Sequence, residues 1–259
     1  MNKKIGILLL AAVFVLIGCN QKKSGENLDS SIEKKIDKIM ADMTLEEKVG
    51  QMAQFTLDVI GKGPNVFSSD EPFQIDQAML DTVIGKYKVG SILNTANNRA
   101  RTPEVWEYIV RTIQERAIKE TGIPVIYGID SNHGTTYTAG GTFFPQEIGM
   151  AATFNTALTE EGSRISAYET RASNIPWTFN PTMDLGRDAR WSRQWESYGE
   201  DPYLNARMAV ASVKGFQGPD HNNIGRDYIA ACIKHYMGHG VPVSGKDRTP
   251  AVISESELR

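Results

Sequence analysis

The chain is poor in cysteine, with only Cys19 and Cys232 in 259 residues. At most one internal disulfide is therefore available, which excludes a disulfide-stapled scaffold and leaves a packed core as the source of stability. The sequence also lacks a block of basic residues beyond its first few positions, and its formal net charge is −3. This charge gives no general attraction to nucleic acid, so no nucleic-acid partner is expected.

Glycine-rich phosphate motifs and metal-binding motifs are absent as well. No strand-like segment is followed by the glycine fingerprint of a dinucleotide site, and no phosphate-loop pattern occurs. Cys232, His235 and His239 have spacings that suggest zinc, but Gly238 and Gly240 interrupt the helix that such a site needs. The sequence therefore predicts neither a cofactor nor a metal ion.

Residues 1–19 have the features of a bacterial targeting segment. Two lysines precede an apolar run from Ile5 to Ile17, which is too short for a comfortable membrane span. The run leads into the sequence LIGC, which resembles the lipobox of bacterial lipoproteins and ends in Cys19. We therefore predict a lipoprotein signal peptide, lipidation of Cys19, and a membrane anchor on the periplasmic or cell-surface side. An ordinary signal peptide with an incidental cysteine is the alternative.

After the signal peptide, residues 20–30 are expected to form a polar tether and residues 31–259 a folded domain. Within this domain helix-like and strand-like segments alternate. Capping residues, periodic apolar positions and stop signals predict helices that begin after Thr44, run from Pro103 to Gly122, cover 156–173, and run from Pro202 to Gly218. Short apolar runs predict strands at 89–93, 123–130, 177–180 and 229–234.

Strands that recur at intervals of about forty residues, each separated by a helix, indicate βαβ units and a parallel sheet. Because no dinucleotide fingerprint is present, a barrel is favoured over a doubly wound sheet. The predicted fold class is α/β, a (β/α)8 TIM-type barrel. Such a barrel takes about 250 residues of domain, and by its strand count this one is expected to be incomplete in this chain.

Polar residues stand where three of these apolar strands end. Asp130 ends one, Asn180 ends the next, and Lys234 with His235 follows the last. In β/α barrels the active site lies at the carboxyl ends of the strands, so these side chains are expected to meet on one face.

Four motifs in this order make the chain similar to a known family. GIDSNHG at 128–134, FFPQEIGMAATFN at 143–155, NPTMDLGRDARWSRQWESYGEDPY at 180–203 and KHYMGHG at 234–240 resemble the N-terminal domain of family 3 glycoside hydrolases of the β-glucosidase type. The resemblance covers nearly everything from about residue 36 to residue 259.

The resemblance implies that Asp130, Arg193, Lys234 and His235 hold a pyranose ring. The chemistry agrees, because a carboxylate accepts from hydroxyl groups, a guanidinium presents a planar fork of donors, and an ammonium donates as a point charge. The expected ligands are β-linked glucosides or oligosaccharides. The other charged residues of the long motif are expected to cross-link the loop through ion pairs; these are Arg187, Asp188, Arg190, Glu196, Glu200 and Asp201. Trp191 and Trp195 are expected to pack, with a platform for an aglycone at the rim of the site as the alternative.

The resemblance also implies a retaining mechanism with two carboxylates about 5–5.5 Å apart. The nucleophile is an aspartate in a Ser-Asp-Trp-like motif and the acid/base a glutamate in a later domain, so both are expected beyond Arg259. The N-acetylhexosaminidase branch is disfavoured, because no histidine follows His239. The chain alone is therefore expected to be inactive. A non-catalytic sugar-binding lipoprotein and an unrelated phosphate- or metal-dependent barrel enzyme are the alternatives.

Overall fold

The computed structural model describes residues 26–220 and 223–259, and it divides into two compact units, Met1–Lys48 and Val49–Arg259. Cys19 and the predicted signal peptide lie outside the described residues. No helix in the described part of the chain is long and apolar enough to span a membrane.

The first unit contains helix α2 (Glu26–Ala41) and the start of α3 (Leu45–Gln51). Helix α2 takes in positions 26–30, which the sequence predicted to be part of the tether. The capping box before α3 is confirmed. Thr44 Oγ1 accepts from the backbone N–H of Glu47 at 3.2 Å, and the Glu47 carboxylate accepts from the backbone N–H of Thr44 at 3.0 Å.

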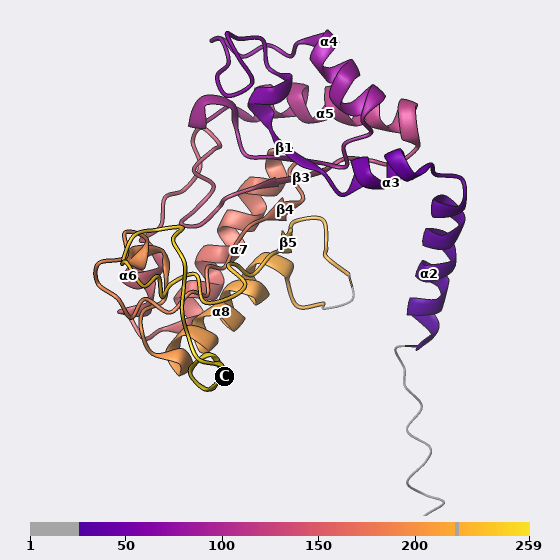
Figure 1. Ribbon diagram of the computed structural model, residues 1–259. Coiled ribbons are helices and arrows are strands. Elements are labelled where there is room, and N and C mark those ends of the chain that lie inside the picture. The colour runs from indigo at the N-terminus through magenta and orange to yellow at the C-terminus, as the bar shows by residue number, and fades with distance from the viewer. Residues whose placement is uncertain (1–25, 221–222) are drawn as a thin grey trace, which may run out of the picture. The chain divides into compact units, whose positions relative to one another are not determined.

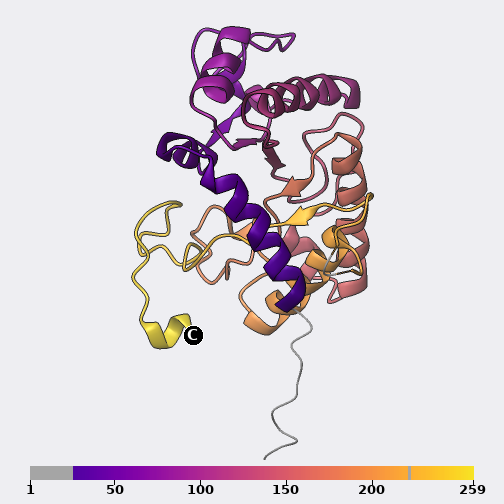
Figure 2. The same cartoon turned by 90° about the vertical axis from the view of Figure 1, so that its right-hand side faces the viewer.

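The second unit is built on a five-stranded sheet in which every neighbouring pair is parallel. The strands lie side by side in chain order (Figure 1, Figure 2): β1 (Gln54–Thr56), β2 (Ser91–Leu93), β3 (Ile126–Ile129), β4 (Trp177–Thr178) and β5 (Ala230–Ala231). A doubly wound sheet would reverse its strand order at a switch point, whereas a β/α barrel adds each strand beside the last. The predicted α/β fold is confirmed, and the barrel does not close within the described residues.

Helical segments connect consecutive strands. They are η1 (Leu57–Ile60), α4 (Gln77–Leu80) and η2 (Asp81–Lys86) after β1; η3 (Ala96–Asn98) and α5 (Pro103–Thr121) after β2; α6 (Glu147–Ala151) and α7 (Thr156–Ala172) after β3; η4 (Gln194–Glu196) and α8 (Pro202–Gln217) after β4; and α9 (Glu255–Leu258) after β5.

Helix α5 forms as its sequence predicts. Thr102 is the N-cap, Pro103 occupies the first turn, and Gly122 ends the helix with a left-handed φ of 70°. Its buried face includes Ile109 and Ile113, which join the main apolar core with residues of η1, β2 and β3. This helix therefore fixes the half of the sheet from which Asp130 projects.

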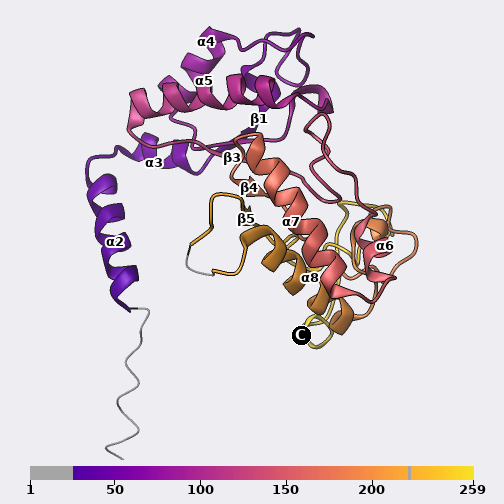
Figure 3. The same cartoon turned by 180° about the vertical axis from the view of Figure 1, so that it is seen from behind.

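Helices α7 and α8 pack closely against each other (Figure 3). A Cβ atom on Gly215 of α8 would lie 2.2 Å from the backbone oxygen of Glu160 on α7, so only glycine permits this approach. The hydroxyl groups of Ser163 and Ser212 hydrogen-bond across the interface at 2.9 Å. Small residues thus set the spacing of the pair, which supports β4, β5 and the loops that follow them.

The strands are shorter than the apolar runs predict. The run at 229–234 contributes only Ala230 and Ala231 to the ladder, and Lys234 instead pairs with Thr182 outside the named strands. Cys232, which lies in this run, is partly exposed. Strand β1 was not predicted, because its three residues, QFT, are exposed and do not form an apolar run.

Candidate active site

The carboxyl ends of β2, β3 and β5 bring three polar residues together. Asp130 follows β3 directly, and its Oδ1 accepts from Lys234 Nζ at 2.6 Å. Asp130 Oδ2 accepts from Asn94 Nδ2 at 2.9 Å, while Asn94 Oδ1 accepts from the backbone N–H of Asp130. Asn94 was missed by the sequence analysis, although it follows an apolar strand in the same way as Asp130 does.

Arg193 is held by a second carboxylate. Its Nε and Nη2 donate to the two oxygens of Glu196 at 2.8 and 2.6 Å, a bidentate pair in which the Glu196 side chain is 8% exposed. This pairing raises the pKa of Arg193 above its ordinary value. The short helix η4 places both residues, and the predicted cross-linking role of Glu196 takes this specific form.

His235 is oriented by a buried carboxylate. Its Nδ1 lies 2.7 Å from Oδ2 of Asp184, whose side chain is 1% exposed. Donation from Nδ1–H to this carboxylate leaves Nε2 of a neutral ring as an acceptor. The ring of His235 also packs on the ring of His239, with centroids 4.3 Å apart.

Asn132 connects the ion pair of Asp130 with Lys234 to the ion pair of Glu196 with Arg193. Its Oδ1 accepts from Lys234 at 3.0 Å, and its Nδ2 lies 3.5 Å from Glu196 Oε2, which is a long contact. Asp130 and Lys234 are thus linked to Arg193 through Asn132 and Glu196. His235 reaches Arg193 through His239, whose Nε2 lies 3.3 Å from Arg193 Nη1. The structure therefore gathers all four predicted sugar-holding residues into one connected cluster.

Some of the remaining residues of the long motif form contacts that support the loop, and others lie exposed. Asp188 pairs with Arg190 at 2.7 Å, and Asp201 caps α8 by accepting from the backbone of Leu204. Trp191 packs as predicted, with 2% of its surface exposed. The packing prediction for Trp195 is wrong: this residue is 46% exposed, and its Nε1 donates to the backbone oxygen of Ser192.

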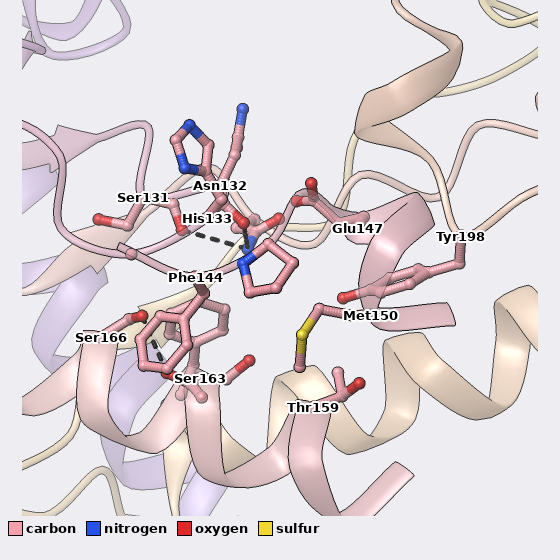
Figure 4. Close-up of a pocket in the computed structure, with 15 residues that line it drawn as sticks. Ser131, Asn132, His133, Phe144, Glu147, Met150, Thr159, Ser163, Ser166 and Tyr198 are labelled. Carbon is pink, nitrogen blue, oxygen red and sulfur yellow. Dashed lines mark hydrogen bonds between the residues drawn. The ribbon is translucent and has the colours of Figure 1, made fainter. Parts of the chain in front are cut away.

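A small cavity of about 30 Å³ lies beside the loop that contains Asn132 (Figure 4). Glu147 lines it with a side chain that is 2% exposed, and neither carboxylate oxygen has a partner among the described residues. Burial raises the pKa of Glu147 to about 8; the backbone N–H of the same residue and the charge of Lys234 oppose the increase, and repulsion from Glu196 adds to it. The carboxyl group is therefore mostly protonated at neutral pH. No sequence pattern indicated this, since burial depends on the tertiary fold.

Residues 44–259 match the model of the "Glycosyl hydrolase family 3 N terminal domain". The chain belongs to glycoside hydrolase family 3. The "Lysosomal beta glucosidase" of Dictyostelium discoideum is 36% identical over 90% of this chain and 29% of its own length. The "Periplasmic beta-glucosidase" of Salmonella typhimurium is 30% identical over 85% of this chain and 25% of its own length.

Solved structures agree with the family 3 assignment. An exo-1,3/1,4-β-glucanase from a Pseudoalteromonas species superposes with a TM-score of 0.75 at 32% identity, over 88% of this chain and 28% of its own. A β-glucosidase from Listeria innocua in complex with glucose gives 0.68 at 28% identity, over 87% of this chain and 29% of its own. The chain thus spans between a quarter and a third of the length of these relatives.

Proposed function

We propose that the protein hydrolyses terminal β-D-glucosyl residues of β-glucosides and oligosaccharides, and that this chain supplies the sugar-holding part of the active site. The observation that supports the proposal is unused hydrogen-bonding capacity at the cluster around Asp130, Arg193, Lys234 and His235. Each side chain is fixed by protein partners, yet each retains donors or acceptors that no described residue uses.

Lys234 and Asp130 illustrate this capacity. The Lys234 ammonium has three N–H donors, of which Asp130 and Asn132 take two. The Asp130 carboxylate offers about four lone-pair positions, and Lys234 and Asn94 occupy one on each oxygen. One donor and two acceptor positions thus remain at partly exposed groups, whose side chains are 14% and 30% exposed.

Arg193 and His235 extend the same surface. Glu196 uses two of the five guanidinium N–H donors and His239 faces a third, so two donors of Arg193 remain for a ligand. His235 presents Nε2. A pyranose carries hydroxyl groups on neighbouring carbons, each both a donor and an acceptor, and this mixture of fixed donors and acceptors suits it. A sugar that lacks a matching hydroxyl would leave a buried polar group unpaired, at a cost of about 1–3 kcal/mol.

We propose further that hydrolysis is retaining, with a nucleophile and an acid/base that stand outside this chain. Two observations support the position of both carboxylates outside this chain: the relatives are three to four times longer than the matched part, and the sequence has no Ser-Asp-Trp stretch. The two carboxyl groups would lie about 5–5.5 Å apart across the glycosidic bond. The chain 1–259 by itself is expected to release no aglycone from an aryl β-glucoside.

The site of action is proposed to be a bacterial membrane surface, periplasmic or outside the cell, reached through lipidation of Cys19. The support is the LIGC sequence after a basic and apolar segment. Several acyl chains at about 0.8 kcal/mol for each buried CH₂ would hold the protein stably on a bilayer.

The test is made in the complete reading frame, with aryl β-glucoside and aryl β-xyloside as substrates. Asp130→Ala removes two charge-assisted hydrogen bonds to the sugar, each worth about 1.5–3 kcal/mol, so kcat/KM should fall about 10²–10⁴-fold. Asp188→Asn, in a neighbouring ion pair, is the matched control and should stay close to wild type. A folded Asp130→Ala enzyme within tenfold of wild type would show that the sugar does not bind there.

The same assay separates the alternatives. A complete protein that binds glucose but turns over neither substrate would be a sugar-binding lipoprotein. The xyloside comparison matters because the relatives also include a "Putative beta-xylosidase" of Formosa agariphila, 28% identical.

A further inference from the structure

One ring nitrogen of His239 faces both a hydrogen-bond donor and a hydrogen-bond acceptor beside the proposed sugar site. Nε2 of His239 lies 3.3 Å from Arg193 Nη1, which is always a donor, and 3.2 Å from Asp247 Oδ1, which is an acceptor. An imidazole nitrogen either carries a hydrogen or offers a lone pair. Nε2 can therefore bond Arg193 when it is unprotonated or Asp247 when it is protonated, but it cannot bond both.

The surroundings of His239 favour the neutral ring. Burial lowers its pKa most, the neighbouring His235 and Arg193 lower it further, and Asp184 and Asp247 act in the opposite direction. These are the titratable and charged groups that face the ring. The edge of Trp191 also packs on it, with centroids 5.7 Å apart and the rings nearly perpendicular.

Asp247 is itself held in place while it faces His239. Its Oδ1 accepts from Trp191 Nε1 at 3.0 Å, and Trp191 is buried. On the other side, Glu196 fixes the Nε and Nη2 edge of Arg193, so Nη1 is the part of the guanidinium that His239 controls. Protonation of His239 would replace an attraction to Arg193 by the repulsion of two neighbouring cations.

We propose that His239 is a positioning residue for Arg193 that works through exchange of its Nε2 partner. In the neutral ring with its hydrogen on Nδ1, Nε2 accepts from Arg193 Nη1 and holds the guanidinium in the sugar-binding orientation. In the cationic ring, Nε2–H donates to Asp247 and displaces Arg193. The inference rests on the proposed function, since it concerns how the same cluster binds a sugar, and it predicts that sugar affinity falls as His239 becomes protonated.

The linkage is reciprocal, which makes it measurable from both sides. If glucose binds the neutral form about tenfold better, saturating glucose must lower the pKa of His239 by about one pH unit. The probe is glucose because it is uncharged across the range. Its affinity is measured by calorimetry from pH 5 to pH 7.5, and His239 is followed by NMR of histidine labelled at ring Cε1, its signal assigned as the one missing in His239→Gln.

Three substitutions separate positioning from a merely structural role. His239→Gln keeps an acceptor for Arg193 without a titrating group, so glucose affinity should match wild type at pH 7.5 and lose its decline toward pH 5. His239→Leu removes both the acceptor and the titrating group, so affinity should lie about fivefold or more below that of wild type at pH 7.5 and should show no further decline toward pH 5. Asp247→Asn removes the negative charge that stabilises the protonated ring, so the affinity decline should move to lower pH. Asp188→Asn is the matched control and should leave the profile unchanged.

The outcomes are distinct. Suppose that the wild-type protein binds glucose. If His239→Gln then shows the same pH profile as wild type, or if glucose does not shift the His239 signal, the inference is overturned and the proposed function stands. Wild-type protein that binds no glucose at any pH overturns the proposed function itself. Because His235 is retained in all these variants, a decline that persists in His239→Gln would be assigned to His235.

Discussion

Glu147 gives the sharpest test of the structure, because an unpaired buried carboxyl group must make stability depend on pH. Its pKa is raised from 4.5 to about 8 by burial. Between these values the folded chain keeps a proton that the unfolded chain has lost, so stability falls as pH rises. Below about pH 4.5 both states are protonated and the group has no effect, whereas above pH 8 the full cost is present.

The size of the effect follows from the same two values. At about 1.4 kcal/mol for each pH unit, the interval from 4.5 to about 8 corresponds to at most about 5 kcal/mol. Glu147→Gln replaces the carboxyl group with a neutral amide of similar shape. The variant should lie within about 1 kcal/mol of wild type at pH 5 and should be more stable by about 3–5 kcal/mol at pH 9.

The measurement is urea unfolding of wild type and Glu147→Gln at intervals from pH 5 to pH 9, with the infrared band of a protonated carboxylic acid as a second readout. Glu161→Gln is the matched control, because Glu161 is an exposed residue whose carboxylate pairs with Arg164. The control should follow the wild-type profile. If Glu147→Gln also follows the wild-type pH profile, and the infrared band is the same in both proteins, Glu147 is ionised in the folded protein. Its carboxyl group is then not buried without a partner.

Three further predictions concern the anchor, the helix pair and a helix cap. Cys19→Ala should move the protein out of the membrane fraction of its host, and a variant that fractionates like wild type would contradict lipidation. Gly215→Ala should lower the free energy of unfolding by about 1–3 kcal/mol or more, because its Cβ would lie 2.2 Å from the Glu160 backbone oxygen; an unchanged urea midpoint would mean that α7 and α8 are further apart. Asp201→Ala should cost about 1 kcal/mol through loss of the cap on Leu204, with Asp201→Asn close to wild type; equal midpoints for Ala and Asn would exclude the cap.

The elements that the sequence predicted well are those with a local cause. Helix α5 begins at its Thr-Pro cap and ends at Gly122, and α8 runs from Pro202 to Gln217 with Gly218 following it. Caps and periodic apolar faces act over a few residues, so their effect can be recognised without the fold. The strands were predicted in position but not in extent, because strand ends depend on which neighbour offers hydrogen bonds. Residue 234, for example, leaves the expected strand to pair with Thr182.

Among the site residues, too, those with a local sequence pattern could be predicted and those defined by distant partners could not. Asp130 could be found because a charged group ends an apolar run, and that rule would also have found Asn94. The roles of His239 and Asp247 had no comparable signal, because each is defined by a partner from another part of the fold: Arg193 for His239, and Trp191 for Asp247.

The sequence by itself determined the α/β class, the parallel strand order and the set of polar residues at the strand ends, since these follow from local patterns repeated along the chain. Only the tertiary structure decided which of those residues touch. Lys234 reaches Asp130 across 104 positions of sequence at 2.6 Å, and the pKa of Glu147 is raised because packing removes its carboxyl group from water. Both depend on distances and burial that arise when the sheet and its helices assemble, and no pattern within a few residues specifies them.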